Sequence, residues 1–206
     1  MDWSGPYIGV LAGYTAGQVV DNSQSQFFGF PLPSLTDYIN LNGGTFGGLV
    51  GFNYQTSGIV VGVEADLADT AMSGFKDFPG NLSTDPYHTD VDTHWTGHLR
   101  ARFGVPADKF LFFVAGGLAV TDLDYRYHWP PVMTDVYSSQ AQYLGLSLGA
   151  GVEYAITPSI LLRAEYLYDN YGSHSFVFDD PSISYHASDE VSLQTHTVRM
   201  ALSYKF

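Results

Sequence analysis

The stretch HTVRMALSYKF at residues 196–206 sorts its side chains into two sets by alternate position. One set is small or polar and includes two cations, Arg199 and Lys205. Successive side chains of a β-strand point to opposite faces, so this period of two predicts a strand with one charged face and one apolar face. The apolar face ends in an aromatic residue and consists of Val198, Met200, Leu202, Tyr204 and Phe206.

The same period of two recurs along the chain. Each segment is close to the ~9–11 residues that a tilted transmembrane strand requires, and no apolar run approaches the ~20 residues of a spanning helix. Tight turns follow every second segment, and long polar loops are predicted near residues 18–42, 71–92, 125–140 and 172–190. The eight predicted strands cover residues 6–17, 43–54, 59–70, 93–105, 110–124, 141–155, 160–171 and 191–206.

Isolated charges at alternate positions indicate which face is polar. In residues 59–70, Val61, Val63 and Leu67 alternate with Glu64 and Asp66. Charged residues make up only 14% of the chain, against ~25% in soluble domains, which is too few for a wetted outer surface. We therefore predict an all-β fold with one domain over residues 1–206. It is a closed eight-stranded antiparallel up-and-down transmembrane β-barrel, apolar outside and polar inside, with short periplasmic turns and four long extracellular loops.

The strand at residues 110–124 is harder to orient, because both of its faces contain large apolar residues. One parity ends in Asp122 and Asp124, so we expect that parity to point inward together with Phe110, Phe112 and Val114. The opposite set is then expected to face lipid and comprises Leu111, Phe113, Ala115, Ala119, Leu123 and Tyr125.

The expected interior contains four carboxylates and four arginines. Buried charges are costly unless they are paired, so a packed core requires this balance. An eight-stranded barrel is just wide enough for side chains to fill it, and we expect a plugged core rather than a diffusion pore. His94 and His98 are also expected inside the barrel. Asp169 is expected to belong to the acidic end that carries the long loops. The predicted ion-pair network comprises Glu64, Asp66, Arg100, Arg102, Glu153, Arg163, Glu165 and Arg199.

Aromatic residues are expected to form belts at the two membrane interfaces, where amphipathic rings are favoured. At the end with the short turns the expected belt contains Trp3, Tyr54 and Tyr154. At the end with the long loops it contains Tyr14, Trp95 and Tyr168.

Several of these stretches resemble the small alphaproteobacterial outer-membrane proteins of the porin-like, OmpA-type β-barrel family. The resemblance is carried by DWSGPYIGVLAGY at 2–14, GGTFGGLVGFNYQ at 43–55, GAGVEYAITPSILLRAEYLY at 149–168 and HTVRMALSYKF at 196–206. It implies an eight-stranded barrel in the bacterial outer membrane that supports the envelope and associates with lipopolysaccharide. The terminal Phe206, with the apolar residues at alternate positions before it, resembles the signal read by the barrel-assembly machinery.

The charge balance restricts the partners. A formal net charge of −13 does not suit nucleic acid, which requires clustered Lys and Arg. The acidic loop stretches at 77–92 and 178–190 are expected to hold divalent cations only loosely, because neither has the spacing of a calcium loop. We expect no cofactor and no dedicated metal site.

Three alternatives to a structural barrel stay open. One is a narrow ion channel. Another is a surface adhesin or self-assembling protein that uses its loops, among which QSQFFGFPLPS at 24–34 is unusually apolar. The third is a lipid-modifying enzyme, which we do not expect because the Ser, His and Asp residues of the loops form no nucleophile motif.

Overall fold

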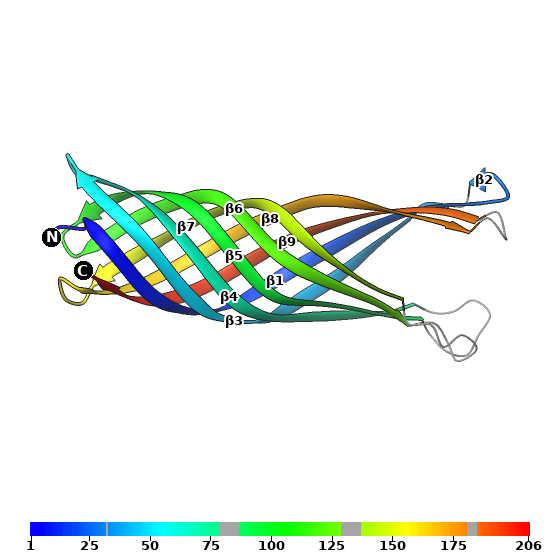
Figure 1. Ribbon diagram of the computed structural model, residues 1–206, viewed down its shortest axis with the longest axis horizontal. Helices are drawn as coiled ribbons and strands as arrows, with labels where there is room; N and C mark the ends of the chain where they lie inside the picture. Colours follow the sequence, from blue (N-terminus) through cyan, green and yellow to red (C-terminus); the bar gives the residue numbers. More distant parts are fainter. Residues whose placement is uncertain (32, 79–86, 129–136, 181–184) are drawn as a thin grey trace.

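Eight long antiparallel strands close into a barrel (Figure 1). The computed structural model describes residues 1–31, 33–78, 87–128, 137–180 and 185–206. Each of the eight long strands pairs with the next long strand along the chain, the short β2 pairs with β1, and pairing of β1 with β9 closes the ring. The described residues contain no helix that is long and apolar enough to cross a bilayer. The strands are β1 (Gly5–Phe27), β2 (Phe30–Pro31), β3 (Leu35–Thr56), β4 (Ile59–Phe78), β5 (Tyr87–Ala107), β6 (Phe110–His128), β7 (Tyr137–Ala155), β8 (Ile160–Asp180) and β9 (Tyr185–Lys205).

The closed antiparallel barrel confirms the predicted fold, but the strands are longer than predicted. The shortest of the eight, β6 and β7, have 19 residues, and β1 has 23. At least half of each segment predicted as a long loop is therefore strand, although residues 79–86, 129–136 and 181–184 lie outside the described part. The outer face of these extensions carries polar residues, as where the Thr36 hydroxyl donates to Asn22 across β1 and β3. In these extensions apolar and polar residues no longer alternate as they do in the predicted strands, but the strands remain paired.

The barrel separates into two sheets at the end opposite to the termini (Figure 1). Pairing of β3 with β4 ends at Asn42 and Ser73, and pairing of β7 with β8 ends at Leu146 and Asn170. All other neighbours stay paired almost to the strand tips. The distal parts of β8, β9, β1 and β3 thus form one sheet, and those of β4, β5, β6 and β7 form the other.

A bulge accompanies each separation. The register shifts between Asp69 and Met72 in β4, and between Asn170 and Ser173 in β8. Gly172 lies in the second bulge with φ +67°, a conformation that other residues rarely adopt. Bulges commonly end strand pairing and redirect a strand, and here they mark the height at which the ring opens.

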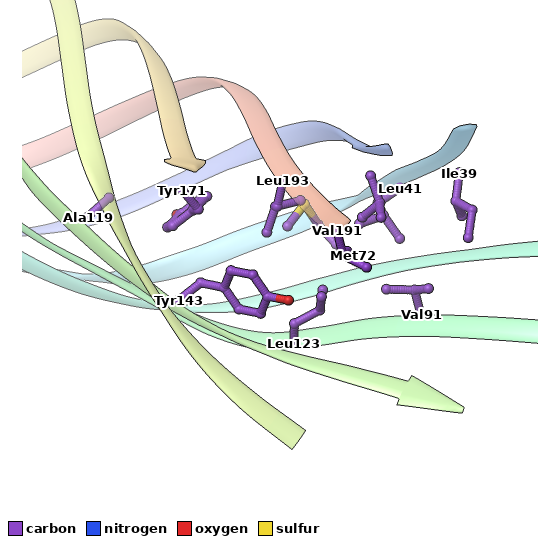
Figure 2. Close-up of a cluster of buried hydrophobic side chains, with 11 residues drawn as sticks. Ile39, Leu41, Met72, Val91, Ala119, Leu123, Tyr143, Tyr171, Val191 and Leu193 are labelled. Carbon is purple, nitrogen blue, oxygen red and sulfur yellow. The ribbon is translucent and has the colours of Figure 1, made fainter. Parts of the chain in front are cut away.

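Apolar side chains fill both ends of the interior. The mouth cluster, at the end with the termini, consists of Trp3, Val60, Leu111, Ala155 and Leu161. The distal cluster packs between the two distal sheets, and Figure 2 shows its side chains pointing toward one another. It consists of Val19, Ile39, Leu41, Met72, Val91, Ala119, Leu123, Tyr143, Tyr171, Val191 and Leu193.

Strand β6 has the orientation opposite to the one predicted. Phe112 is 57% exposed on the outer wall, whereas Phe113 is 4% exposed inside. The prediction assumed that Asp122 points inward, but a local contact holds it on the outer side. Its carboxylate accepts hydrogen bonds from the backbone N–H groups of His94 and Trp95, at the irregularity in β5. The inward residues include Leu111, Phe113, Ala115, Ala119 and Leu123, and the outward ones include Phe110, Phe112 and Val114.

Candidate functional site

The charged interior is built from facing positions on neighbouring strands. Strand register places Glu64 opposite Arg100, Glu153 opposite Arg163, and Glu165 opposite Arg199. Directly opposed residues of antiparallel strands have neighbouring side chains, so each of these pairs forms with little rearrangement. All eight residues of the predicted network are buried inside the barrel.

Ion pairs that cross the lumen join these local pairs into one network. Glu64 lies at its centre, with Arg163 Nη2 at 2.6 Å from Oε2 and Arg100 Nη2 at 2.8 Å from Oε1. Arg100 Nη1 reaches Glu165 across the barrel at 2.7 Å. Arg102 Nη2 contacts Glu153 at 2.9 Å. Arg199 extends the network to Asp66, also at 2.9 Å.

Two aromatic rings complete the network on the side of the mouth cluster. The Tyr7 hydroxyl donates to Glu64 at 2.8 Å. The guanidinium of Arg102 lies 4.2 Å from the ring centre of Phe113, a cation–π distance. A Cβ at Gly151 would stand 2.8 Å from Phe113 Cζ, so a side chain there would displace the ring. Because β6 is oriented with Phe113 inward, an apolar ring packs against the charged groups.

His98 and Asp169 extend the network beyond the eight predicted residues. Asp169 was predicted to belong to the acidic outer end, yet it is 2% exposed and faces the lumen. His98 Nδ1 lies 2.8 Å from Asp66 Oδ1, and Nε2 lies 3.4 Å from Asp169 Oδ2. Protonation of His98 would add a fifth positive charge beside Asp66 and Asp169. Asp169 occupies the same set of alternate positions as Arg163 and Glu165. This spacing was the signal in the sequence that Asp169 faces the lumen.

His94 does not lie inside as predicted. Its side chain is 55% exposed, and Nδ1 lies 3.0 Å from Asp122 Oδ2 on the outer side. The irregularity of register between Asp92 and Thr96 breaks the strict alternation that relates His94 to His98. Parity counted through an irregular strand is therefore a poor guide to side-chain direction.

Trp3 closes the mouth instead of joining an aromatic belt as predicted. Its ring is 0% exposed and packs in the mouth cluster. The Trp3 backbone N–H donates to Gln55 Oε1 at 2.8 Å, and the Lys205 ammonium donates to the carbonyl of Asp2. Hydrogen bonds from Ser4 to the Asp2 carboxylate hold the pKa of Asp2 below its ordinary value. Residues 2–4 thus fold back beneath the barrel and insert the indole into it.

The other predicted belt residues lie at the outer wall or partly covered beside it. Tyr14, Tyr54 and Tyr154 are exposed, while Trp95 and Tyr168 are half-buried. The five residues predicted as an assembly signal also share the outer face: Val198, Met200, Leu202, Tyr204 and Phe206 are all exposed. Their recognition during assembly stays a prediction.

No group of three or more His, Asp or Glu side chains within the described ranges is arranged to hold a metal ion. The acidic stretches 77–92 and 178–190 are only partly described. Loose cation binding by these stretches stays a prediction.

Comparison with known proteins places the whole chain among barrel proteins. Residues 1–206 match the family described as outer membrane protein beta-barrel domain. The chain is 31% identical to the 31 kDa outer-membrane immunogenic protein of Brucella melitensis, over 99% of this chain and 84% of the relative. It is 28% identical to the 22 kDa outer membrane protein of Rhizobium leguminosarum, over 99% of this chain and 78% of the relative.

A solved structure shares the fold at low sequence identity. The outer membrane protein OprG from Pseudomonas aeruginosa superposes with a TM-score of 0.60 at 14% identity. The match covers 98% of this chain and 97% of that one. This likeness concerns the fold alone.

Proposed function

This chain belongs to the outer membrane protein β-barrel domain family, and from that premise we propose that it is a structural barrel that supports the outer membrane without conducting ions. The observation that carries the proposal is the filled interior. Apolar clusters occupy both ends, and five carboxylates, four arginines and His98 lie between them, a set that protonation of His98 would make neutral. An ion that crossed would have to leave water at each apolar end, which is costly.

Planar-bilayer recording tests this proposal. The reconstituted protein is expected to give no steady current at neutral pH, while a general porin reconstituted in parallel serves as the positive control. Reproducible single-channel steps from the properly folded barrel would favour the narrow channel instead.

We also propose that the acidic outer end binds lipopolysaccharide through divalent cations. Asp69 is exposed on the outer wall, between Phe46 and Trp95 on the neighbouring strands, where the apolar band ends. A carboxylate at this height can share Mg²⁺ or Ca²⁺ with a lipid phosphate. The amount of lipopolysaccharide that co-purifies should fall after EDTA and in the Asp69→Asn variant. Equal retention in all three samples argues against cation bridging.

Surface contact is a second candidate, supported by the tip of the β1–β2 hairpin. Phe28 and Phe30 are largely exposed there, and Phe28 and Gly29 have φ values of +50° and +77°. A bulky residue with positive φ is uncommon, and such strain often accompanies function. The Brucella relatives are named immunogenic proteins, which suits a tip accessible on the cell surface. Self-association by sedimentation that is lost in a Phe28→Ser, Phe30→Ser variant would support this role.

We propose no catalytic activity. His98 is enclosed between two carboxylates, and within the described residues neither it nor His94 is hydrogen-bonded to a serine hydroxyl. Such a contact is the usual starting point of hydrolysis by serine. Mass spectrometry of lipid A after co-expression should show the unmodified pattern, and any new acylated or deacylated product would contradict this proposal.

A further inference from the structure

The outer wall contains an apolar hollow of about 750 Å³ that spans β5 to β9. Its floor is formed by small residues, Ala150, Gly151 and Ala164. Phe103, Phe112 and Tyr166 stand around that floor. We call this feature the wall hollow. A void of this size in a bilayer would forfeit dispersion contacts along its lining, so hydrocarbon must fill it.

The barrel wall itself keeps the hollow open. Gly151 adds no side chain to the floor, and its Cβ position faces the lumen, where the Ala164 carbonyl oxygen and the Phe113 ring already crowd it. Ala150 and Ala164 point outward on the neighbouring strands β7 and β8. The floor therefore lies deeper than the surrounding aromatic wall, because these two outward positions carry only methyl groups.

The hollow runs upward from the periplasmic side of the membrane. Phe112 lies two positions above Phe110, where the β5–β6 turn ends. At the other end of the hollow, Val198 lies eight residues before Phe206. A chain of hydrocarbon that follows this course has its lower end at the periplasmic interface, so it belongs to a lipid of the periplasmic leaflet.

Two opposite charges stand at the lower end of the hollow. Asp108 and Lys109 are adjacent and exposed in the β5–β6 turn. Phe112 is three residues beyond Lys109, roughly 10 Å along an extended strand. Lys109 can meet a phosphate, and Asp108 can meet an ammonium group. A headgroup that carries both charges matches this turn better than one that carries only a phosphate.

A second copy of the chain fits the hollow poorly. A twofold interface would place the same concave patch against itself, leaving the two hollows face to face and unfilled. A head-to-tail contact would instead require a matching projection, and it would continue into open chains of molecules.

We propose that the wall hollow binds one acyl chain of a phospholipid whose headgroup carries a phosphate and a primary ammonium. Such a lipid sits with its phosphate at Lys109, its ammonium at Asp108 and its chain over Ala150 and Ala164. This inference concerns the lipid-facing wall and does not depend on the proposed function of the interior.

Native mass spectrometry of the whole protein, released from detergent with phosphatidylethanolamine, tests the site. The wild type should retain one phosphatidylethanolamine in preference to phosphatidylcholine or phosphatidylglycerol. The Ala150→Leu, Ala164→Leu variant should retain about tenfold less, because the loss of contact with about two methylene groups corresponds to that factor. Ala12→Leu is the matched control, since Ala12 also points outward but lies on β1, which contributes no residue to the lining of the hollow.

The headgroup contacts are tested separately. Lys109→Gln and Asp108→Asn should each lower phosphatidylethanolamine retention about two- to fivefold, as expected for exposed charge pairs. Asparagine also tolerates the positive φ of Asp108. Thermal unfolding in detergent checks that every variant is folded. Equal retention by the Ala150→Leu, Ala164→Leu and Ala12→Leu variants would overturn the proposal, and so would a dimer that the Ala150→Leu change dissociates.

Discussion

The membrane-embedded ring and the two distal sheets are built from the same strands with opposite polarity. On β9, Val198 faces outward and Arg199 inward within the ring, whereas farther up Gln194 faces outward and Leu193 inward. The parity of the strand does not change between these positions. The chemistry inverts because lipid surrounds the ring, while water surrounds the distal sheets.

This inversion teaches that the solvent outside, rather than the strand itself, sets which face must be apolar. The ring has lipid outside and buries its charges in a paired core. The distal sheets enclose a conventional apolar core, as a soluble sandwich does. The bulges in β4 and β8 lie where one arrangement gives way to the other.

The largest effect is expected from breaking the charged core of the ring. Arg199→Leu removes one 2.9 Å ion pair from Asp66 and one from Glu165, and leaves the buried network one positive charge short. It should lower the free energy of unfolding by about 3–5 kcal/mol. Arg126→Leu is the distal control, because the Arg126 side chain is half exposed and lies 4.0 Å from the Asp124 carboxylate. Urea unfolding in lipid vesicles measures both. Wild-type stability of Arg199→Leu would refute the role of the network.

A smaller loss is expected from opening the distal core. Leu193→Ala removes a fully buried side chain between the two sheets and should cost about 3 kcal/mol. The loss should appear in the distal strands first, as faster proteolysis of the extracellular part in intact vesicles. Leu146→Ala, on the lipid-facing wall, is the matched control. If the two variants are cleaved equally fast, the distal cluster does not hold the sheets together.

The third prediction compares two outward-facing residues of β9, one in the ring and one in the distal sheets. Val198→Lys places a cation against lipid and should cost about 2 kcal/mol, with reduced insertion. Gln194→Lys lies on the same outer face in water and should change stability little, beyond the loss of its hydrogen bond with Tyr168. The folded fraction after refolding into vesicles compares them. Equal behaviour of the two variants would remove the boundary we place between ring and distal sheets.

The smallest effect needs no substitution. Alternate backbone amides of β7 between Tyr137 and Gly145 face the open side of their sheet, since β7 and β8 are not paired above Leu146 in the described residues. These amides should exchange with solvent faster than the amides of residues 147–155 in the same strand. Uniform protection along β7 would show that the ring continues upward.

Sequence reasoning succeeded where lipid imposes a strict rule. Arg100, Glu153 and Arg199 each stand alone among apolar neighbours of the other parity, so their inward position followed from the period of two. The rule fails once water lies outside, and the distal strand extensions were therefore predicted as loops. It also fails where a local contact overrides it, as in the capping of the β5 irregularity by Asp122. Trp3 precedes the first strand, and no periodicity could place it.

The buried indole of Trp3 has a consequence for the order of events during assembly. Its site is made by β4, β6, β7 and β8, and the carbonyl of the preceding residue, Asp2, accepts a hydrogen bond from Lys205 on β9. The site therefore exists only after β4 has come together with β6, β7 and β8 around the lumen. Insertion of Trp3 must therefore be a late event in assembly. The fluorescence of Trp3 should shift to the blue after the spectroscopic signal of the β-sheet has formed. This shift would mark the completion of the barrel.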